Sequence, residues 1–229
     1  MNRKDALHLA IIPDGNRRWA KARSLNPWKG HETAIENFRS ITDWCRKNPR
    51  IGALTVWCFS TENWKRDPKE VRELMRFYEE YLNRERKGFL EKKTRFMHSG
   101  RLDRIPSSLA ALIHDVQEET KTQKEFILNL AVDYGGKDEI IRALNKFIKA
   151  NEANEANEAI LARFLDHPDL PDIDLVIRTS GEMRTSNFFL WESTYAEWIF
   201  LEKYFPDLST DDLEQALGEF DARKRRFGS

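Results

Sequence analysis

The sequence predicts a single α/β domain, residues 1–229, built on a six-stranded, mainly parallel sheet flanked by helices. Short apolar runs alternate with longer amphipathic ones, the pattern of this fold class. The 229 residues, 40% of them hydrophobic, are enough for one sizeable core. No linker divides the chain. Its one low-complexity stretch, NEANEANEA at Asn151–Ala159, is predicted to be a solvated helix or a connection between helices.

The individual strands and helices follow from periodicity and turn residues. The predicted strands are His8–Pro13, Ala53–Phe59, Arg95–His98, Phe126–Val132, Asp174–Ile177 and the weaker Trp198–Leu201. The predicted helices span about 31–47, 68–90, 107–122, 136–150 and 209–225. The helix at 68–90 has the clearest signals, because Asp67 is a good N-cap and Pro68 suits the first helical position.

Charge and composition exclude several classes of protein. The chain carries 38 Lys and Arg against 38 Asp and Glu, which argues against binding nucleic acid over a whole surface. Cys45 and Cys58 lack metal-ligand spacing, so neither a disulfide framework nor a zinc site is expected. There is no signal-peptide pattern, and no run approaches the ~18 apolar residues of a membrane helix. We therefore expect a cytoplasmic protein without a transmembrane segment.

The most informative local feature is IIPDGNRRWAKAR at residues 11–23, where a strand ends and a helix begins. Ligands of open α/β sheets bind at the carboxyl ends of strands, and a helix start there suits a phosphate. Gly15 lets the backbone approach closely, while Arg17 and Arg18 add positive charge. Asp14 fits beside a phosphate if Mg2+ bridges the two. The alternative is an ordinary Asp-Gly turn with surface arginines.

A second signal, IRTSGEMRTSNF at residues 177–188, also follows a predicted strand. Arg178, Arg184 and Ser186 donate hydrogen bonds, and two guanidiniums suit a diphosphate. The alternative is a surface loop with salt-bridged arginines. Because this loop and the one at 11–23 would meet at one rim of the sheet, we expect a site for two phosphorylated ligands and a cation. Phosphoryl transfer, prenyl transfer and nucleotide binding all remain open at this point.

A third polar loop lies within CFSTENWKRDPKEV at residues 58–71, before the long helix. Taken alone, it is best interpreted as a structural loop capped by Asn63 or Asp67. His31 follows Gly30 at the start of a predicted helix, where a single histidine is more often a cap or a core residue than a catalyst.

Taken together, these motifs resemble the cis-prenyltransferase family of the undecaprenyl diphosphate synthase type. The motifs are IIPDGNRRWA, Gly30-His31, FSTENWKR at Phe59–Arg66, NLAVDYGG at Asn129–Gly136, the segment 174–200 and RRFG at Arg225–Gly228. They occur in the family's order and spacing from about residue 8 to 228. Any one motif is modest evidence, whereas the ordered set is highly specific.

The resemblance implies a fold and an activity. The fold is a six-stranded parallel sheet with an apolar tunnel beside it, in a homodimer. The activity is sequential head-to-tail condensation of isopentenyl diphosphate with an allylic diphosphate, such as farnesyl or geranylgeranyl diphosphate. The product is a polyprenyl diphosphate with cis double bonds, of undecaprenyl length or shorter. Nucleic acid has no part in it, and transient membrane contact during product release is compatible with it.

The resemblance also assigns roles to individual residues. The catalytic set is Asp14, Asn63, Arg66 and His31. The allylic diphosphate site is Gly15, Asn16, Arg17, Arg18, Trp19, Lys29 and His31. The isopentenyl diphosphate site is Arg178, Arg184 and Ser186, and the loop that orders over the substrates contributes Phe59, Ser60, Glu62, Trp64 and Glu70. The cofactor is Mg2+, associated with Asp14 and Glu197. The residue that accepts the proton is not assigned.

Some positions depart from the common bacterial pattern. Arg17 replaces a usual glycine, Pro13 a usual methionine, and Pro27 an arginine that holds the allylic diphosphate, so that Lys29 or Arg17 is expected to substitute. Tyr81, like Glu73, is unusual on a helix expected to line the tunnel, which makes a shorter product a real alternative.

Three other functions are weighed against this one. The first is a silent subunit of an active partner, disfavoured because Asp14 and Asn63 are present. The second is irregular coupling of the lavandulyl type, disfavoured because Arg66 and Glu70 are retained. The third is a non-enzymatic phosphate- or lipid-binding module. It is disfavoured because one arginine-bearing loop is enough to bind one ligand, whereas this chain has two such loops and an acid between them.

Overall fold

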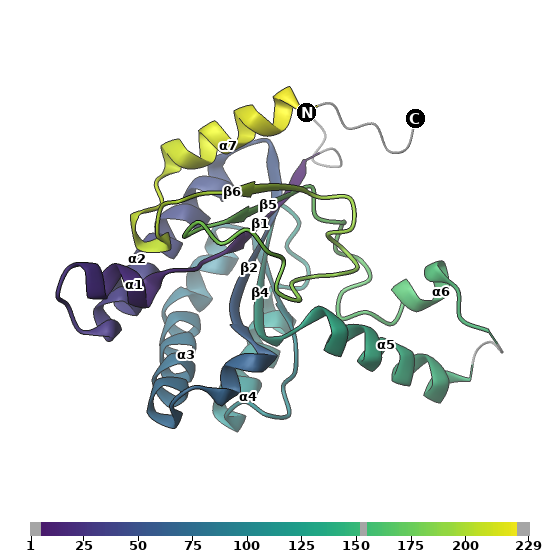
Figure 1. Cartoon of the computed structure of the whole chain (residues 1–229). Helices are drawn as coiled ribbons and strands as arrows, with labels where there is room; N and C mark the ends of the chain where they lie inside the picture. Colours follow the sequence, from purple (N-terminus) through teal and green to yellow (C-terminus); the bar gives the residue numbers. More distant parts are fainter. Residues whose placement is uncertain (1–5, 152–154, 224–229) are drawn as a thin grey trace.

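The computed structural model describes residues 6–151 and 155–223, and in these ranges it shows one six-stranded sheet (Figure 1). Every pair of neighbouring strands is parallel, in the order β3-β4-β2-β1-β5-β6. The strands are β1 (Leu7–Ile12), β2 (Ile51–Ser60), β3 (Thr94–Ser99), β4 (Phe126–Tyr134), β5 (Leu175–Arg178) and β6 (Glu197–Phe200). The predicted fold class is therefore confirmed, including the weak sixth strand.

The helices also lie close to the predicted positions. They are α1 (Asn16–Ala22), α2 (Pro27–Lys47), α3 (Pro68–Glu91), α4 (Ser107–Thr120), α5 (Gly136–Ala150), α6 (Glu158–Ala162) and α7 (Thr210–Ala222), with 3-10 helices η2 (Thr61–Lys65) and η3 (Phe205–Asp207). The prediction started α2 four residues too late, at His31. The true start has the same signal as α3, because Asn26 caps the Trp28 N–H at 3.1 Å and Pro27 is the first helical residue.

The described part of the low-complexity stretch lies between α5 and α6 and includes the first two residues of α6, in line with its interpretations as a connection or a helix. α5 ends at Ala150 and α6 begins at Glu158, while residues 152–154 lie outside the described ranges. The predicted end of the last helix at 225 and the RRFG motif at Arg225–Gly228 lie outside them as well. None of the helices within the described ranges has the length and apolar character required to cross a bilayer.

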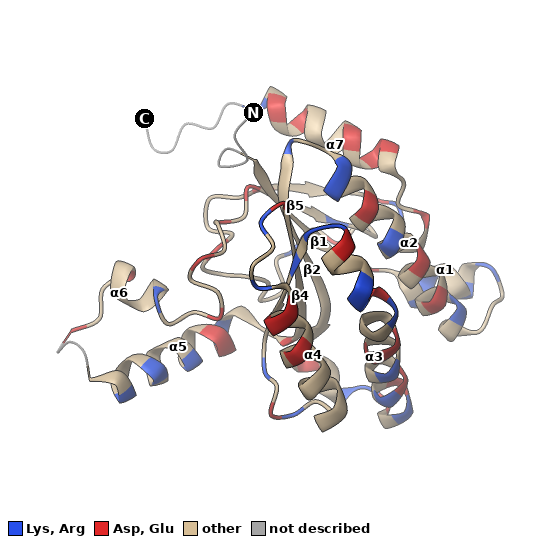
Figure 2. Cartoon of the chain, turned by 180° about the vertical axis from the view of Figure 1, so that it is seen from behind, with Lys and Arg blue, Asp and Glu red and all other residues tan. Residues whose placement is uncertain are grey.

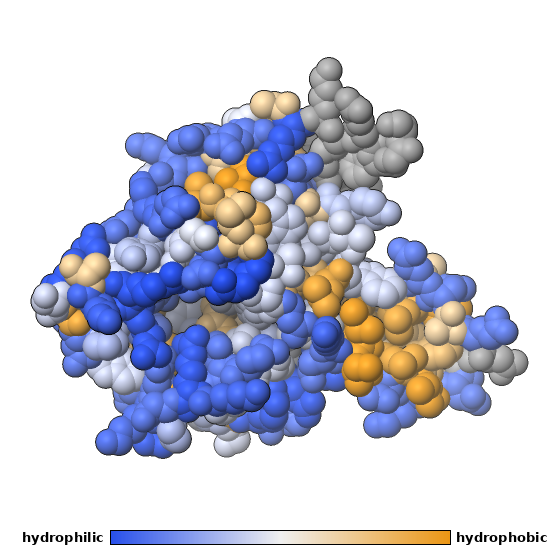
Figure 3. Space-filling view, in the orientation of Figure 1, coloured by the Kyte–Doolittle hydropathy of each residue, from blue (hydrophilic) through white to orange (hydrophobic). Residues whose placement is uncertain are grey.

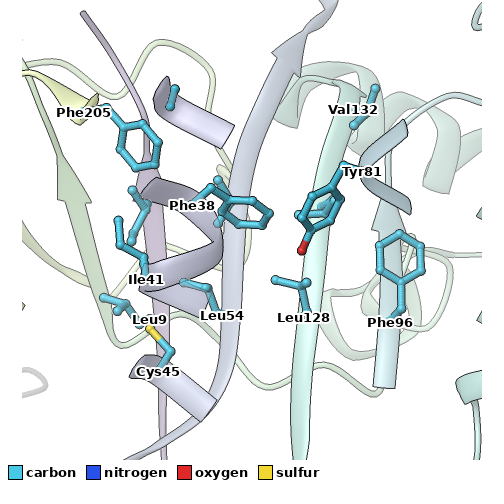
Figure 4. Close-up of a cluster of buried hydrophobic side chains, with 14 of the residues drawn as sticks. Leu9, Phe38, Ile41, Cys45, Leu54, Tyr81, Phe96, Leu128, Val132 and Phe205 are labelled. Carbon is cyan, nitrogen blue, oxygen red and sulfur yellow. The ribbon is translucent and has the colours of Figure 1, made fainter. Parts of the chain in front are cut away.

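The two faces of the sheet carry cores of different size. Leu9 of β1 and Leu54 of β2 belong to the larger core, which they form with residues of α2, α3, α4 and α7 (Figure 4). The alternate residues Ala10 and Ile12 of β1 face the smaller core. That core is closed by the chain between β5 and β6, where Phe188 is fully buried.

The chain order fixes where a ligand can bind. From β1 the chain moves to β2 on one side, and it later returns to form β5 on the other side of β1. The connections that leave β1 and β5 diverge at this switch point and open a crevice at the carboxyl ends of the strands. Ile12 of β1 pairs in register with Arg178 of β5, so Asp14 and Arg178 face each other across the crevice.

Candidate functional site

A central cavity of about 1030 Å3 opens at the carboxyl ends of β1, β2 and β5. Its mouth is polar, and Figure 3 shows it as a hollow rimmed by hydrophilic residues. Its inner part runs between α2 and α3 and is lined mainly by apolar side chains: Ala34, Ile35, Phe38, Val56, Cys58, Leu74, Phe77, Tyr78, Tyr81 and Leu130. A polar mouth over an apolar interior suits an amphipathic ligand.

An ion pair between Asp14 and Arg178 joins the two sides of the mouth. Arg178 Nη2 donates to Asp14 Oδ2 at 3.0 Å, and only 4% of the arginine side chain is exposed. Arg178 Nη1 donates to Ser186 Oγ at 2.9 Å and also to the Arg184 carbonyl oxygen. A buried guanidinium is costly unless it is paired and hydrogen-bonded, so these contacts fix the loop after β5 relative to the loop after β1.

The turn at Gly15 brings the two loops into close contact. Gly15 has φ +93°, which favours glycine, and a Cβ there would lie 2.8 Å from Ser180 Oγ in the loop after β5 and 2.5 Å from Tyr204 Cδ1 after β6. Thr179 Oγ accepts the Asp14 N–H at 2.8 Å and donates to the Asp14 carbonyl oxygen at 2.9 Å. Sequence reasoning did not find Thr179; the signal was its place after Arg178, at the end of a strand beside Asp14.

The more exposed arginines of the mouth are paired with two carboxylates. Glu182 accepts from Arg18 at 2.7 Å and also from Arg184. Glu70 accepts from Arg17 at 3.3 Å and from Arg66 at 3.1 Å. Each carboxylate thus joins two guanidiniums, as a diphosphate could. Glu182 was also missed by sequence reasoning, although it lies within the loop at 177–188.

Several buried polar atoms at this site lack hydrogen-bond partners. Within the part of the chain that the structure describes, three of them belong to residues that line the cavity: Asn16 Oδ1, His31 Nε2 and Arg178 Nε. Because such atoms are costly in a closed core, they indicate a place where a ligand or water completes the bonding. Burial, aided by Arg66 and Arg17 and opposed by Glu70, lowers the pKa of His31 to about 4. Its imidazole is therefore neutral at physiological pH.

The loop after β2 is held by caps and by aromatic packing. Asn63 Oδ1 accepts the Ser60 N–H at 3.1 Å and completes a capping box for η2, which agrees with the capping interpretation of Asn63. Trp64 Nε1 donates to Asp133 Oδ1 at 2.8 Å, and its ring packs edge-on against Phe59 at 5.2 Å. Neither aromatic ring lines the central cavity.

The structure brings most of the predicted residues together at the central cavity. Those that line it are Asp14, Gly15, Asn16, Arg17, Arg18, His31, Ser60, Glu62, Asn63, Arg66, Arg178 and Ser186. Those that do not are Trp19, Lys29, Phe59, Trp64, Glu70, Arg184 and Glu197. Glu70 and Arg184 still contact the mouth through the ion pairs above.

Three of the predicted residues have other partners. Trp19 Nε1 donates to Asp207 at 2.7 Å, which anchors α1 on η3. Lys29 is exposed and pairs with Glu32 at 2.6 Å. Glu197 accepts from Arg223 at 2.8 Å and starts β6, three residues before the end that faces the site, or ~10 Å along the strand.

Among the described residues, no group of three or more His, Cys, Asp or Glu side chains could hold a metal ion. Asp14 stands at the mouth with its side chain 31% exposed, beside arginines suited to phosphate. Because Mg2+ is commonly held by one or two carboxylates plus substrate phosphates, this single acid fits an ion that arrives with a diphosphate.

The fold and site define an α/β protein whose polar mouth and apolar cavity suit ligands with a phosphorylated head and an apolar tail. The chain belongs to the undecaprenyl diphosphate synthase family, because residues 12–228 match the family described as "Putative undecaprenyl diphosphate synthase". It is 44% identical to the isoprenyl transferase of Wolinella succinogenes and 40% identical to that of Helicobacter pylori strain 26695, each over 96% of both chains.

Solved structures show the same fold over whole chains. Lavandulyl diphosphate synthase from Lavandula x intermedia, in complex with dimethylallyl diphosphate, superposes with a TM-score of 0.92 at 34% identity. A probable undecaprenyl diphosphate synthase from Campylobacter jejuni superposes with a TM-score of 0.83 at 33% identity. Both comparisons cover 100% of each chain.

Proposed function

We propose that the chain is a cis-prenyltransferase that condenses isopentenyl diphosphate head-to-tail with an allylic diphosphate, repeatedly, to give a polyprenyl diphosphate. The observation that carries the proposal is the polar mouth, joined by Asp14 and Arg178, over an apolar cavity. The two arginine-bearing loops supply donors for two diphosphates, and the cavity has space for one growing tail. The related structure that contains dimethylallyl diphosphate supports an allylic ligand.

The residues of the mouth divide between the two substrates. Arg17 and Arg18, beside the Gly15 turn, hold the allylic diphosphate and stabilise the negative charge that develops as it leaves. Arg178, Arg184 and Ser186 hold isopentenyl diphosphate, whose double bond attacks the allylic carbon as the allylic diphosphate leaves. The cation formed on the isopentenyl unit then loses a proton to a base and regains a double bond. His31 offers its buried Nε2, which has no hydrogen-bond partner within the described residues, to a diphosphate oxygen.

Asp14 is the proposed ligand of Mg2+, which when bound neutralises diphosphate oxygens. The departure at Pro27 leaves one arginine fewer at the allylic side, and Arg17 compensates because it lines the cavity while Lys29 does not. For Glu197, the start of β6 favours a structural or dimer-contact role over direct contact with the ion at Asp14.

Substitution of Asp14 tests the proposed chemistry. Asp14→Asn keeps one acceptor for Arg178 but removes the balancing charge and leaves an amide NH2 in place of one accepting oxygen, so we expect the free energy of unfolding to fall by about 2–3 kcal/mol while the chain stays folded. We expect turnover to fall by about a hundredfold or more, because the cation loses its protein ligand. The measurement is incorporation of labelled isopentenyl diphosphate with Mg2+ and geranyl, farnesyl or geranylgeranyl diphosphate, with products sized by chromatography.

Other outcomes of this assay favour the competing functions. Near-full turnover by the folded Asp14→Asn protein would contradict the role of Asp14. Branched products would establish irregular coupling, the reaction class suggested by the lavandulyl diphosphate synthase likeness. Activity that appears only with a second polypeptide would establish a silent subunit. Binding without turnover under every condition would leave a phosphate- or lipid-binding module.

An aromatic pair, Phe38 and Tyr81, is formed by the last residues of α2 and α3 that line the cavity. Phe38 of α2 and Tyr81 of α3 point toward each other with ring centroids 5.1 Å apart (Figure 4). Ile41 and Phe89, further along the same helices, are buried in the core and do not line the cavity. Scaled from a 150 Å3 cavity that binds benzene, about 1030 Å3 holds ~40 carbon atoms, or ~8 isoprene units, including the headgroup space.

We therefore propose that growth beyond this length has to separate Phe38 from Tyr81. Tyr81→Ala removes one ring of the Phe38–Tyr81 pair, and we expect longer products than those of the wild-type chain. Tyr81→Phe keeps the ring and serves as the matched control, with product lengths unchanged. Thin-layer or liquid chromatography of the dephosphorylated products measures the ladder. An identical ladder for Tyr81→Ala would place the length limit elsewhere.

The chain is also proposed to form a homodimer through α5. Its outward residues Ile141, Leu144 and Ile148 are 57%, 37% and 62% exposed and form an apolar patch (Figure 3). The view from behind shows Lys and Arg along the same helix, so α5 is amphipathic with its apolar side uncovered (Figure 2). An exposed patch of this kind is typical of an interaction site.

Light scattering measures this assembly. We expect twice the chain mass of 27.0 kDa for the wild type and a single chain for Ile148→Glu, because the introduced charge opposes burial of the patch. Leu90→Glu, at an exposed leucine of α3, is the control that should stay dimeric. A monomeric wild type, or a dimeric Ile148→Glu, would contradict the proposed interface.

A cytoplasmic location remains part of the proposal. The diphosphate substrates are polar, and the mean hydropathy of the chain is −0.68. Cell fractionation tests the location: recovery of the chain only with membranes after a salt wash would contradict it.

A further inference from the structure

Asn187 is a side chain outside the predicted site, and three loops around the mouth meet there. It follows Ser186 in the loop after β5. It contacts the start of α5, which follows β4, and Glu62 of η2, which follows β2. Its contacts therefore connect the carboxyl ends of three strands.

The contact with α5 is a helix cap supplied by a distant residue. The N-cap position of α5 is Gly135, which has no side chain to cap the helix. The Asn187 carbonyl oxygen accepts the Gly136 N–H at 2.8 Å, and Asn187 Oδ1 accepts the Lys137 N–H at 2.8 Å. These are first-turn donors that a helix leaves without partners, so both acceptors of Asn187 are needed there.

The contact with η2 uses the remaining donor of the same side chain. Asn187 Nδ2 donates to Glu62 Oε1 at 3.3 Å. The packing is close, because a Cβ on Gly135 would lie 2.8 Å from Asn187 Nδ2 and 2.7 Å from Thr61 Oγ1. A shift of any one of the three loops would therefore displace the other two.

The backbone conformation of Ser186 and Asn187 explains why the contacts of Asn187 are important. Ser186 and Asn187 have φ of +52° and +71°, two consecutive left-handed residues that are not glycine. Asparagine tolerates this conformation and serine does so less well. Ser186 Oγ accepts from Arg178 Nη1 at 2.9 Å, so the direction of this hydroxyl depends on the backbone that Asn187 holds.

We propose that Asn187 is a positioning residue that holds the Arg178–Ser186 diphosphate clamp in its binding arrangement and couples it to the loop after β2 through Glu62. The inference rests on the proposed function for the identity of the ligand, isopentenyl diphosphate. The geometry itself requires only that the clamp bind a diphosphate. When the Asn187–Glu62 contact is broken, the clamp and the loop after β2 move independently, and the diphosphate has to order both.

The test is a double-mutant cycle at Asn187 and Glu62. Asn187→Asp keeps both acceptors for α5 and tolerates positive φ, but it loses the donor and places a carboxylate opposite Glu62. We expect inorganic diphosphate, titrated by calorimetry, to bind about tenfold more weakly, and the KM of isopentenyl diphosphate to rise about tenfold. Glu62→Gln alone completes the cycle and is the reference for the double variant, because Glu62 itself lines the cavity. In the Glu62→Gln protein an amide donor faces the new carboxylate, so adding Asn187→Asp there should change both values by no more than about twofold.

Two further readouts separate positioning from general stability. The KM of the allylic diphosphate should stay constant in Asn187→Asp, as should the melting temperature, since the α5 cap is retained. Asn187→Gly keeps the left-handed backbone but removes the side-chain cap and the Glu62 contact, so both diphosphate affinity and melting temperature should fall.

The proposal is overturned if Asn187→Asp binds diphosphate like the wild type, or if Asn187→Asp weakens binding by about the same tenfold factor when it is added to Glu62→Gln. Because diphosphate binding requires no turnover, a wild-type chain that binds diphosphate but makes no polyprenyl product would sink the proposed function alone. The coupling between Asn187 and Glu62 would still be read from the binding cycle.

Discussion

The ion pair between Asp14 and Arg178 is the contact on which the rest of the site depends. It exists because β1 and β5 are parallel neighbours with Ile12 and Arg178 in register, at the point where the chain changes direction across the sheet. Arg178 is almost fully buried and would be costly without Asp14 and its carbonyl and hydroxyl acceptors. The loop after β5 is therefore shaped around a charge that the loop after β1 balances.

The more exposed arginines of the mouth are also paired with carboxylates. Glu182 and Glu70 each join two arginines, so the positive groups that would hold diphosphates are already gathered before a ligand arrives. The net charge of the chain is zero, with 38 residues of each sign, yet the mouth concentrates guanidiniums. Preorganised donors of this kind avoid reorganisation when negative charge develops on a leaving group, and the apolar cavity below excludes water from the tail.

Much of the fold and part of the site follow from sequence alone. Strand ends placed Asp14 and Arg178 at one rim, because parallel strands bring their carboxyl ends together, and helix signals at Asp67 and Pro68 gave the start of α3. The pairing of Glu182 with Arg18 could not be predicted, since it joins irregular loops without periodicity. The direction of Trp64, toward Asp133 rather than the cavity, depends on tertiary packing that a loop sequence does not encode. The same holds for Asn187, whose role as a cap of α5 spans 50 residues of sequence.

If the site works as proposed, Asp14 holds a cation together with a diphosphate at the Arg178 side of the mouth. Electron–nuclear double resonance with Mn2+ in place of Mg2+ tests it without turnover. We expect protein-bound Mn2+ with phosphorus hyperfine coupling only when inorganic diphosphate is present, and loss of that signal in Asp14→Asn. An unchanged signal in Asp14→Asn, or tight Mn2+ binding without diphosphate, would contradict it.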